Sequence, residues 1–260
     1  MSVWYDVHGE GPAVALLHAG AADSRMWEPQ LRSFAESHSV LRVDFPGFGR
    51  TPIEASPVSF RNAVREALDA AEIDRTALVG VSLGGNTALE LAVESPGRVS
   101  ALVLVGAGLP DHKWSEEVTS FFAAEDEALE RGDLDAAVDA NLRTWLAGPN
   151  RNLDTIDSEL RTLVATMQRR AFELQSAWPE LRAERLDPPY SERLRDVNVP
   201  TLVLTGDEDI ADIHQIAERL VAGIPDASRA TIADAAHLPN IERPEEFDRI
   251  VLGFLAEHGV

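Results

Sequence analysis

One serine of this chain stands in a setting that could make its hydroxyl a nucleophile. It is Ser82 of Gly80-Val81-Ser82-Leu83-Gly84, which directly follows an apolar run and directly opens a helical run. A sharp turn from a strand into a helix strains its central residue and needs small neighbours. The turn would expose the Ser82 hydroxyl and would place the backbone N–H of Leu83 at a helix N-terminus, where an anion is favoured. The alternative is a glycine-rich structural turn with an incidental serine.

A free serine hydroxyl is a weak nucleophile and needs a general base. The best candidate among the seven histidines is His237, in a loop between the last predicted strand and the closing helix. His18 lies at a strand end, and we interpret it as a buried structural residue. The other histidines lie in polar or helical surroundings: His8, His38, His112, His214 and His258.

A histidine base must be held in one tautomer by an acid. Three carboxylates follow a predicted strand in Gly206-Asp207-Glu208-Asp209. We predict that Asp209 is the acid, because it leads into the loop beyond the turn. Asp207 could instead form the turn by accepting from backbone N–H groups. Asp111, after another strand, is the remaining alternative.

Acyl transfer also needs hydrogen-bond donors for the oxygen that becomes negative in the transition state. The segment His18-Ala19-Gly20-Ala21 ends a neighbouring predicted strand. The N–H of Gly20, together with that of Leu83, is therefore the predicted oxyanion hole. The alternative for this segment is a simple turn between a strand and a helix.

The elements that must position these residues alternate between apolar strands and helices. Apolar runs predict strands at Ala13–Leu17, Val40–Val43, Ala77–Val81, Val99–Val105, Thr201–Thr205 and Ala230–Ala233. Helical periodicity predicts helices around Met26–Phe34 and at Phe60–Ala71, Leu83–Glu94 and Pro244–Glu257. Fully apolar strands that alternate with helices indicate an α/β fold with a parallel sheet covered on both faces. Trp4–His8 and the following Gly-rich turn predict an antiparallel hairpin at one edge.

The alternation stops in a stretch that is helical throughout. We predict a core of residues 1–108 and 199–260 and a helical cap over 109–198. The large apolar residues of the cap and of the oxyanion loop are predicted pocket walls: Met26, Trp27, Trp114, Phe121, Phe122, Trp145, Met167 and Trp178. The alternative is that the tryptophans only pack the insertion against the sheet. Cap arginines such as Arg143, Arg169 and Arg170 could make the pocket locally positive.

In these motifs the chain resembles the α/β-hydrolase family over nearly its whole length. The resemblance rests on the segments discussed above, on Asp44–Gly49 and on His237–Pro244, and the order Ser, Asp, His is that of the family. It implies a mostly parallel eight-stranded sheet with a helical cap inserted after strand six. The family usually has His-Gly where this chain has His18-Ala19. Within the family, the chain looks most like 3-oxoadipate enol-lactonase-like proteins and small esterases.

Composition excludes several classes of function. With 23 basic and 44 acidic residues the formal net charge is -21, which disfavours nucleic-acid and anionic-membrane partners. The chain has no Cys, so disulfides, thiol catalysis and thiolate metal sites are excluded. No apolar run approaches the roughly 20 residues of a membrane span. Residues Met1–Asp6 do not resemble a signal peptide, so we expect a cytoplasmic monomer or homodimer.

Three hypotheses for function follow from these residues. The leading one is a serine hydrolase that cleaves a small carboxylic ester or lactone through an acyl-enzyme on Ser82, without metal or cofactor. The same three side chains could instead hydrolyse a C–C bond of a diketone-type substrate. The third hypothesis is a non-catalytic ligand-binding protein on the same scaffold. A serine at the turn argues against haloalkane dehalogenases and epoxide hydrolases, which use Asp there.

Overall fold

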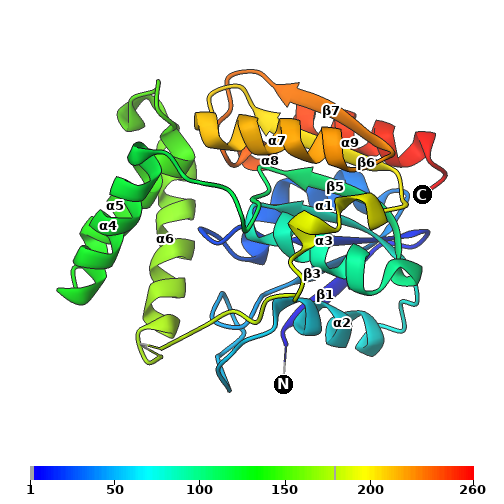
Figure 1. Cartoon of the computed structure of the whole chain (residues 1–260), viewed down its shortest axis with the longest axis horizontal. Coiled ribbons are helices and arrows are strands. Elements are labelled where there is room, and N and C mark those ends of the chain that lie inside the picture. Colours follow the sequence, from blue (N-terminus) through cyan, green and yellow to red (C-terminus); the bar gives the residue numbers. More distant parts are fainter. Residues whose placement is uncertain (1–2, 179) are drawn as a thin grey trace.

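A seven-stranded sheet forms the centre of the protein in the computed structural model, which describes residues 3–178 and 180–260 (Figure 1). The spatial order of the strands is β1-β3-β2-β4-β5-β6-β7, and every neighbouring pair except β1 and β3 is parallel. The strands are β1 (Tyr5–His8), β2 (Ala13–Leu17), β3 (Ser39–Val43), β4 (Thr76–Val81), β5 (Val99–Val105), β6 (Thr201–Gly206) and β7 (Ala227–Ile232). Each predicted apolar run is therefore a strand. The strand β7 begins earlier than predicted because, as an edge strand, it carries exposed Ser228 and Arg229, which break the apolar run.

The helices lie between these strands and at the end of the chain. The α-helices are α1 (Glu28–Ala35), α2 (Phe60–Ala70), α3 (Leu83–Glu94), α4 (Glu116–Glu130), α5 (Leu134–Asn141), α6 (Ser158–Gln175), α7 (Ala211–Gly223), α8 (Pro239–Glu242) and α9 (Pro244–Glu257). Short 3₁₀ turns are η1 (Ser24–Trp27), η2 (Pro96–Arg98), η4 (Leu153–Thr155), η5 (Tyr190–Glu192) and η6 (Leu194–Asp196), and η3 (Leu142–Ala147) is a π-helix. Within the described residues, no helix combines the length and the apolar character that a bilayer crossing requires.

Two expectations about the sheet are wrong. The strand β1 is antiparallel at an edge, as predicted, but it pairs with β3, where His8 lies opposite Val40, and not with β2. The reason is that β3 and β4 occupy both edges of β2, so β1 can pair only with the free edge of β3. The described sheet has seven strands and not eight, and the cap helices consequently follow the fifth strand along the chain and not the sixth.

Alternate residues of the central strands pack on opposite faces of the sheet. In β2, Val14 and Leu16 belong to an apolar cluster with α1 and α9, whereas Ala15 and Leu17 belong to a second cluster with α2, α3 and α7. All four side chains are completely buried. Burial on both faces explains why these strands are continuous apolar runs with no polar alternation. The resulting rigid layer supports the loops at its carboxyl edge, where the candidate residues lie.

The helices α4, α5 and α6 form the segment between β5 and β6 and stand together beside the sheet (Figure 1). Each begins at a polar cap, whose side chain accepts from backbone N–H groups of the first turn: Ser115 for α4, Asp133 for α5 and Asp157 for α6. The helix α5 continues directly into the π-helix η3, which contains Trp145. The predicted boundaries of core and cap remain a proposal.

The imidazole of His18 is buried at the end of β2 and serves the structure. Its Nδ1 donates to the carbonyl of Ala19 at 2.8 Å, and its Nε2 accepts from the N–H of Phe45 at 2.9 Å. Because one nitrogen donates and the other accepts, the ring is the neutral tautomer. Burial lowers the pKa of His18 from its ordinary value, although the charges of Asp44 and Asp23 act in the opposite direction.

This lowered pKa predicts acid sensitivity of the fold. In the unfolded chain His18 takes up a proton near pH 6.5, whereas the folded protein resists protonation to lower pH. The stabilisation is therefore complete above pH 6.5 and is lost as the pH falls towards the folded-state pKa. We expect the free energy of unfolding to fall more between pH 7 and 5 in the wild type than in His18→Asn. Urea unfolding at both pH values measures this, and equal losses would contradict the prediction.

Candidate active site

The turn that carries Ser82 joins β4 to α3 and holds the residue in a strained backbone. Ser82 has φ 52° and ψ −110°, a left-handed region that L-residues rarely adopt, and its N–H donates to Val105 O at 2.8 Å. The flanking glycines are required by space. A Cβ on Gly80 would lie 2.3 Å from the carbonyl group of Gly84, and one on Gly84 would lie 2.1 Å from Leu17 O. The sequence pattern thus marks a turn that only glycines can build around this serine.

The loops after β6 and β7 bring Asp209 and His237 together. Asp209 Oδ2 lies 2.8 Å from His237 Nδ1, and both residues are almost completely buried, with exposed fractions of 4% and 3%. The other oxygen of this carboxylate, Oδ1, accepts from the N–H of Ile210 at 2.9 Å. From the cap, the carbonyl of Trp145 accepts from the backbone N–H of His237 at 3.2 Å, and the indole lies 4.5 Å from the imidazole, tilted by 41°. The imidazole is therefore held from the core and from the cap.

The competing carboxylates lie elsewhere. Asp207 is exposed, and no hydrogen bond of its carboxylate occurs in the described part of the chain. Asp111 forms an exposed ion pair with Arg219 at 2.7 Å, and this partner lowers the pKa of Asp111 against the effect of burial. Glu208 accepts from the amide of Asn150 at 3.1 Å. Of the four candidate acids, the structure brings only Asp209 to His237.

A cavity of about 300 Å³ joins these parts between the sheet edge and the cap. Ser82, Gly20 and His237 all line it, so the predicted nucleophile, base and one oxyanion donor face one space. A Cβ on Gly20 would lie 3.9 Å from the Leu83 Cβ, which places the two predicted oxyanion residues side by side. No hydrogen bond joins the Ser82 hydroxyl to His237 among the described residues; such contacts are often long before substrate binds.

Comparison with known proteins identifies the family of the chain. Residues 12–244 match the family described as alpha/beta hydrolase fold. The chain belongs to this family. It is similar to a RutD protein of Azorhizobium caulinodans, a proposed carbamate hydrolase, with 27% identity over 267 residues, 98% of this chain and 95% of that protein. It is also similar to 3-oxoadipate enol-lactonase 1 of Acinetobacter baylyi, with 25% identity over 98% of this chain and 92% of that protein. The solved enol-lactonase of Burkholderia xenovorans LB400 has the same fold, with a TM-score of 0.80, 23% identity and coverage of 98% and 96%.

The predicted pocket walls of this α/β hydrolase divide into two groups. Trp114, Phe121, Phe122 and Trp145 line the cavity with Ser82. Rings of Phe121 and Trp145 meet edge to face at 5.5 Å, so part of the wall is a packed aromatic cluster that also contacts His237. The cap therefore supplies an apolar surface directly against the imidazole.

The structure places the other four predicted walls away from the cavity. Met26, Trp27 and Met167 are completely buried in the apolar core, and Trp178 borders a separate surface hollow. Trp27 packs against Phe247 of α9, with ring centroids 6.1 Å apart. Met26, Trp27 and Met167 point into the protein because η1 and α6 place their most apolar faces against the core. The helical periodicity of these residues in the sequence reflects that burial.

Sequence reasoning missed a glycine that touches the His–Asp pair of the hydrolase. Gly106 directly follows β5 and has φ 53°. A Cβ there would lie 2.9 Å from Cε1 and 3.0 Å from Nδ1 of His237. The sequence did contain a signal for this residue: Gly106 is a glycine at the end of the apolar strand β5, which pairs with β4, the strand that leads into the Ser82 turn.

We expect Gly106→Ala to impair the hydrolase by displacing the imidazole. A displacement of about 1 Å lowers catalytic rates by about 100-fold. The matched control is Gly132→Ala, because Gly132 has φ 71° but a Cβ there meets nothing within 4 Å. Each variant should lose about 1 kcal/mol of stability to backbone strain, but only Gly106→Ala should lose activity. Measurement of kcat/KM and Tm for both tests this, and equal activities would contradict it.

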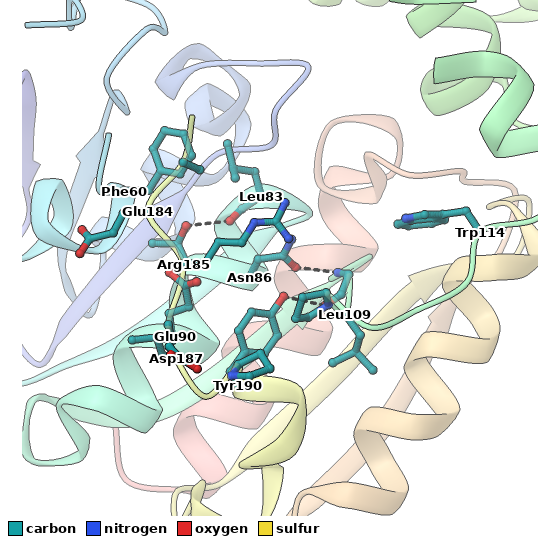
Figure 2. Close-up of a pocket in the computed structure, with 16 residues that line it drawn as sticks. Phe60, Leu83, Asn86, Glu90, Leu109, Trp114, Glu184, Arg185, Asp187 and Tyr190 are labelled. Atoms are coloured by element: carbon teal, nitrogen blue, oxygen red, sulfur yellow. Dashed lines mark hydrogen bonds between the residues drawn. The ribbon is translucent and has the colours of Figure 1, made fainter. Parts of the chain in front are cut away.

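A second hollow of about 550 Å³ lies beside the cavity (Figure 2). The two share Asn86, Gly108 and Trp114 as lining residues, and the side chain of Leu83 faces the second hollow. Asn86 Oδ1 accepts from Gly108 N–H at 2.7 Å, and the Tyr190 hydroxyl donates to Gly108 O at 3.1 Å (Figure 2). Burial raises the pKa of Tyr190, so this hydroxyl remains a neutral donor. These bonds hold the backbone that separates the two spaces.

Proposed function

We propose that this α/β hydrolase cleaves a small carboxylic ester or lactone through an acyl-enzyme on Ser82. The observation that carries the proposal is the buried 2.8 Å pair of His237 and Asp209, whose imidazole lines the same cavity as the strained Ser82. A buried carboxylate on one ring nitrogen leaves the other nitrogen available as a base. Within the described residues, no group of three or more potential ligands could hold a metal ion.

The mechanism follows from the positions of these groups. His237 Nε2 accepts the Ser82 proton as Oγ attacks the substrate carbonyl carbon. The carbonyl oxygen becomes negative and accepts hydrogen bonds from the N–H groups of Gly20 and Leu83. His237 passes this proton to the alcohol oxygen of the substrate as its bond to the carbonyl carbon breaks. The alcohol of an ester then leaves, whereas that of a lactone remains attached to the acyl chain. His237 then takes a proton from water as the water oxygen attacks the acyl carbon. The bond between this carbon and Ser82 Oγ breaks, Oγ takes the proton from His237, and the carboxylic acid is released.

Two of the relatives support an acyl bond as the target, whereas a 2-hydroxy-6-oxononadienedioate/2-hydroxy-6-oxononatrienedioate hydrolase of Paraburkholderia phymatum, 28% identical, keeps C–C hydrolysis as the alternative. An enol-lactonase and a proposed carbamate hydrolase both carry names that specify attack at a carbonyl bearing an oxygen or nitrogen leaving group. The apolar walls from the cap favour a substrate with an apolar body. We expect a small molecule as the substrate. A monomer or homodimer remains the expected assembly.

Labelling with a fluorophosphonate, followed by mass spectrometry and a panel of 4-nitrophenyl esters, tests this proposal. We expect one label per chain on Ser82 and turnover of short-chain esters. Labelling without turnover of any ester would favour C–C hydrolysis. A natively folded protein that never reacts at Ser82 would contradict both enzymatic functions and favour a ligand-binding protein.

A further inference from the structure

Besides Gln175 of α6, whose amide donates to Gly47 O at 3.2 Å, three polar side chains of the cap line the Ser82 cavity. They are Glu125 of α4, Asn141 at the end of α5 and Gln168 of α6. The amide nitrogen of Asn141 donates to Glu125 Oε1 and also to Ala137 O, the latter at 2.9 Å. Asn141 thereby ties the Glu125 carboxylate to α5 and holds it at the wall. None of the three residues belongs to the proposed triad or to the oxyanion hole.

Gln168 has a buried acceptor atom without a hydrogen-bond partner among the described residues. The residue is 4% exposed, and its amide oxygen has no hydrogen-bond partner in the part of the chain that the structure describes. Buried acceptors are almost always bonded, and leaving one unbonded is destabilising. Because Gln168 lines the cavity, a donor on a bound molecule can complete its hydrogen bonding.

The charge of the cavity has one sign. Glu125 is the only carboxylate among the described residues that line it, and the lining includes no Arg or Lys. Burial raises the pKa of Glu125, while the hydrogen bond from Asn141 acts in the opposite direction. Because no Arg or Lys lines the cavity in the described part of the chain, no cation beside the Glu125 carboxylate would repel an ammonium group or attract an anion.

The cap arginines that could have reversed this charge are engaged elsewhere. Arg143 pairs with Asp139 at 2.6 Å, and Arg169 pairs with Asp135. Arg169 and Arg170 border a different hollow on the surface. The expectation that they make the pocket locally positive is wrong, because none of the three lines the cavity.

We propose that Glu125, Asn141 and Gln168 form a specificity subsite that accepts a neutral or cationic hydrogen-bond donor of the substrate and rejects a carboxylate. This inference rests on the proposed function, since it names the class of ester or lactone for that site. A hydroxyl, amide N–H or ammonium group can donate to Gln168 Oε1 and to the Glu125 carboxylate. A substrate carboxylate would face the Glu125 charge with no Arg or Lys in the described lining as counter-ion.

Two series of matched esters test the subsite. Methyl 4-substituted benzoates and 4-substituted phenyl acetates place the ring on either side of the ester, and the substituents are aminomethyl, hydroxymethyl, ethyl and carboxylate. Hydrogen bonds to charged groups correspond to about 10- to 100-fold in a rate or binding ratio. We expect kcat/KM of the wild type to be at least about tenfold higher for the aminomethyl than for the carboxylate ester in one series.

Variants assign this preference to residues. Glu125→Gln keeps an acceptor for Asn141 but removes the charge, so the aminomethyl-to-carboxylate ratio should fall about tenfold. Gln168→Leu should lower the hydroxymethyl-to-ethyl ratio about threefold to tenfold without lowering Tm. The control is Glu130→Gln, which removes one exposed charge of the same helix outside the cavity. A fall of equal size in this control, or unchanged ratios in Glu125→Gln, would overturn the subsite.

Binding separates this proposal from the proposed function. Calorimetric titration of Ser82→Ala with the same esters reports the preference without turnover. If the wild type neither turns over an ester nor reacts with a fluorophosphonate, the serine-hydrolase proposal fails while the titration still decides the subsite. Tighter binding of the aminomethyl ester than of the carboxylate ester supports the subsite. Equal binding, or no measurable binding of the two donor-bearing esters, overturns it.

Discussion

Replacing Ser82 by alanine should lower kcat/KM for the best ester by about 10⁴- to 10⁶-fold, because no other group at this turn can attack the carbonyl. The fold should remain intact. The Ser82 hydroxyl makes no hydrogen bond with another described residue, and the turn itself is held by the Ser82 N–H bond to Val105 O at 2.8 Å, which alanine retains. Steady-state kinetics and Tm measure the two effects, and a residual activity above 1 in about 100 would exclude Ser82 as nucleophile.

Ser82→Gly provides a matched control for the backbone. At φ 52° any Cβ is strained, and glycine relieves a cost of about 1 kcal/mol or more. We therefore expect Ser82→Gly to be as inactive as Ser82→Ala but to have a Tm about 2–4 °C higher. This pair would show that the strain of the wild type belongs to the nucleophile position. A lower Tm for glycine would contradict that explanation.

Asp209→Asn should lower kcat by about 10⁴-fold through the tautomer of His237, as is known for such an exchange in a serine protease. Asp209 Oδ1 accepts from the N–H of Ile210, so the single carbonyl oxygen of an asparagine is best used there. The amide NH₂ would then face His237 Nδ1 and would donate to it. The ring proton would move to Nε2, and that nitrogen could no longer accept the proton of Ser82.

The control for this variant is Asp207→Asn, which removes the same charge from an exposed residue of the same loop. We expect its kcat to stay within about twofold of the wild type, since an exposed charge interacts weakly. Nitrogen NMR of the histidine side chains would report the tautomer directly. If Asp209→Asn were inactive with the proton of His237 still on Nδ1, the tautomer explanation would fail.

Local signals carried most of the fold and of the candidate site. Strands buried on both faces must be continuous apolar runs, so β2, β4 and β5 are readable without knowing their neighbours. The turn at Ser82 is also recognised locally, from small residues between an apolar strand and a helix, although the space at Gly84 is limited by Leu17 O of the neighbouring strand β2. Asp209 and His237 followed from their places after predicted strands, because parallel strands end at one edge of a sheet.

Non-local choices were not readable in the same way. The strand with which β1 pairs depends on the rest of the sheet, because both edges of β2 are paired with β3 and β4. Periodicity shows that Met26, Trp27 and Met167 are buried, but it does not distinguish burial in the core from burial in a cavity wall. The contact of Gly106 with His237 joins two loops more than 100 residues apart in the chain.

The sequence alone determined the α/β class, the turn around Ser82 and the candidate acid and base that follow later strands, because each of these depends on a short stretch of chain. Tertiary structure alone decided which aromatic rings face the cavity, and that Glu125, Asn141 and Gln168 share its wall. Those facts depend on how separate helices and loops pack, and packing selects among directions that a linear pattern leaves equivalent.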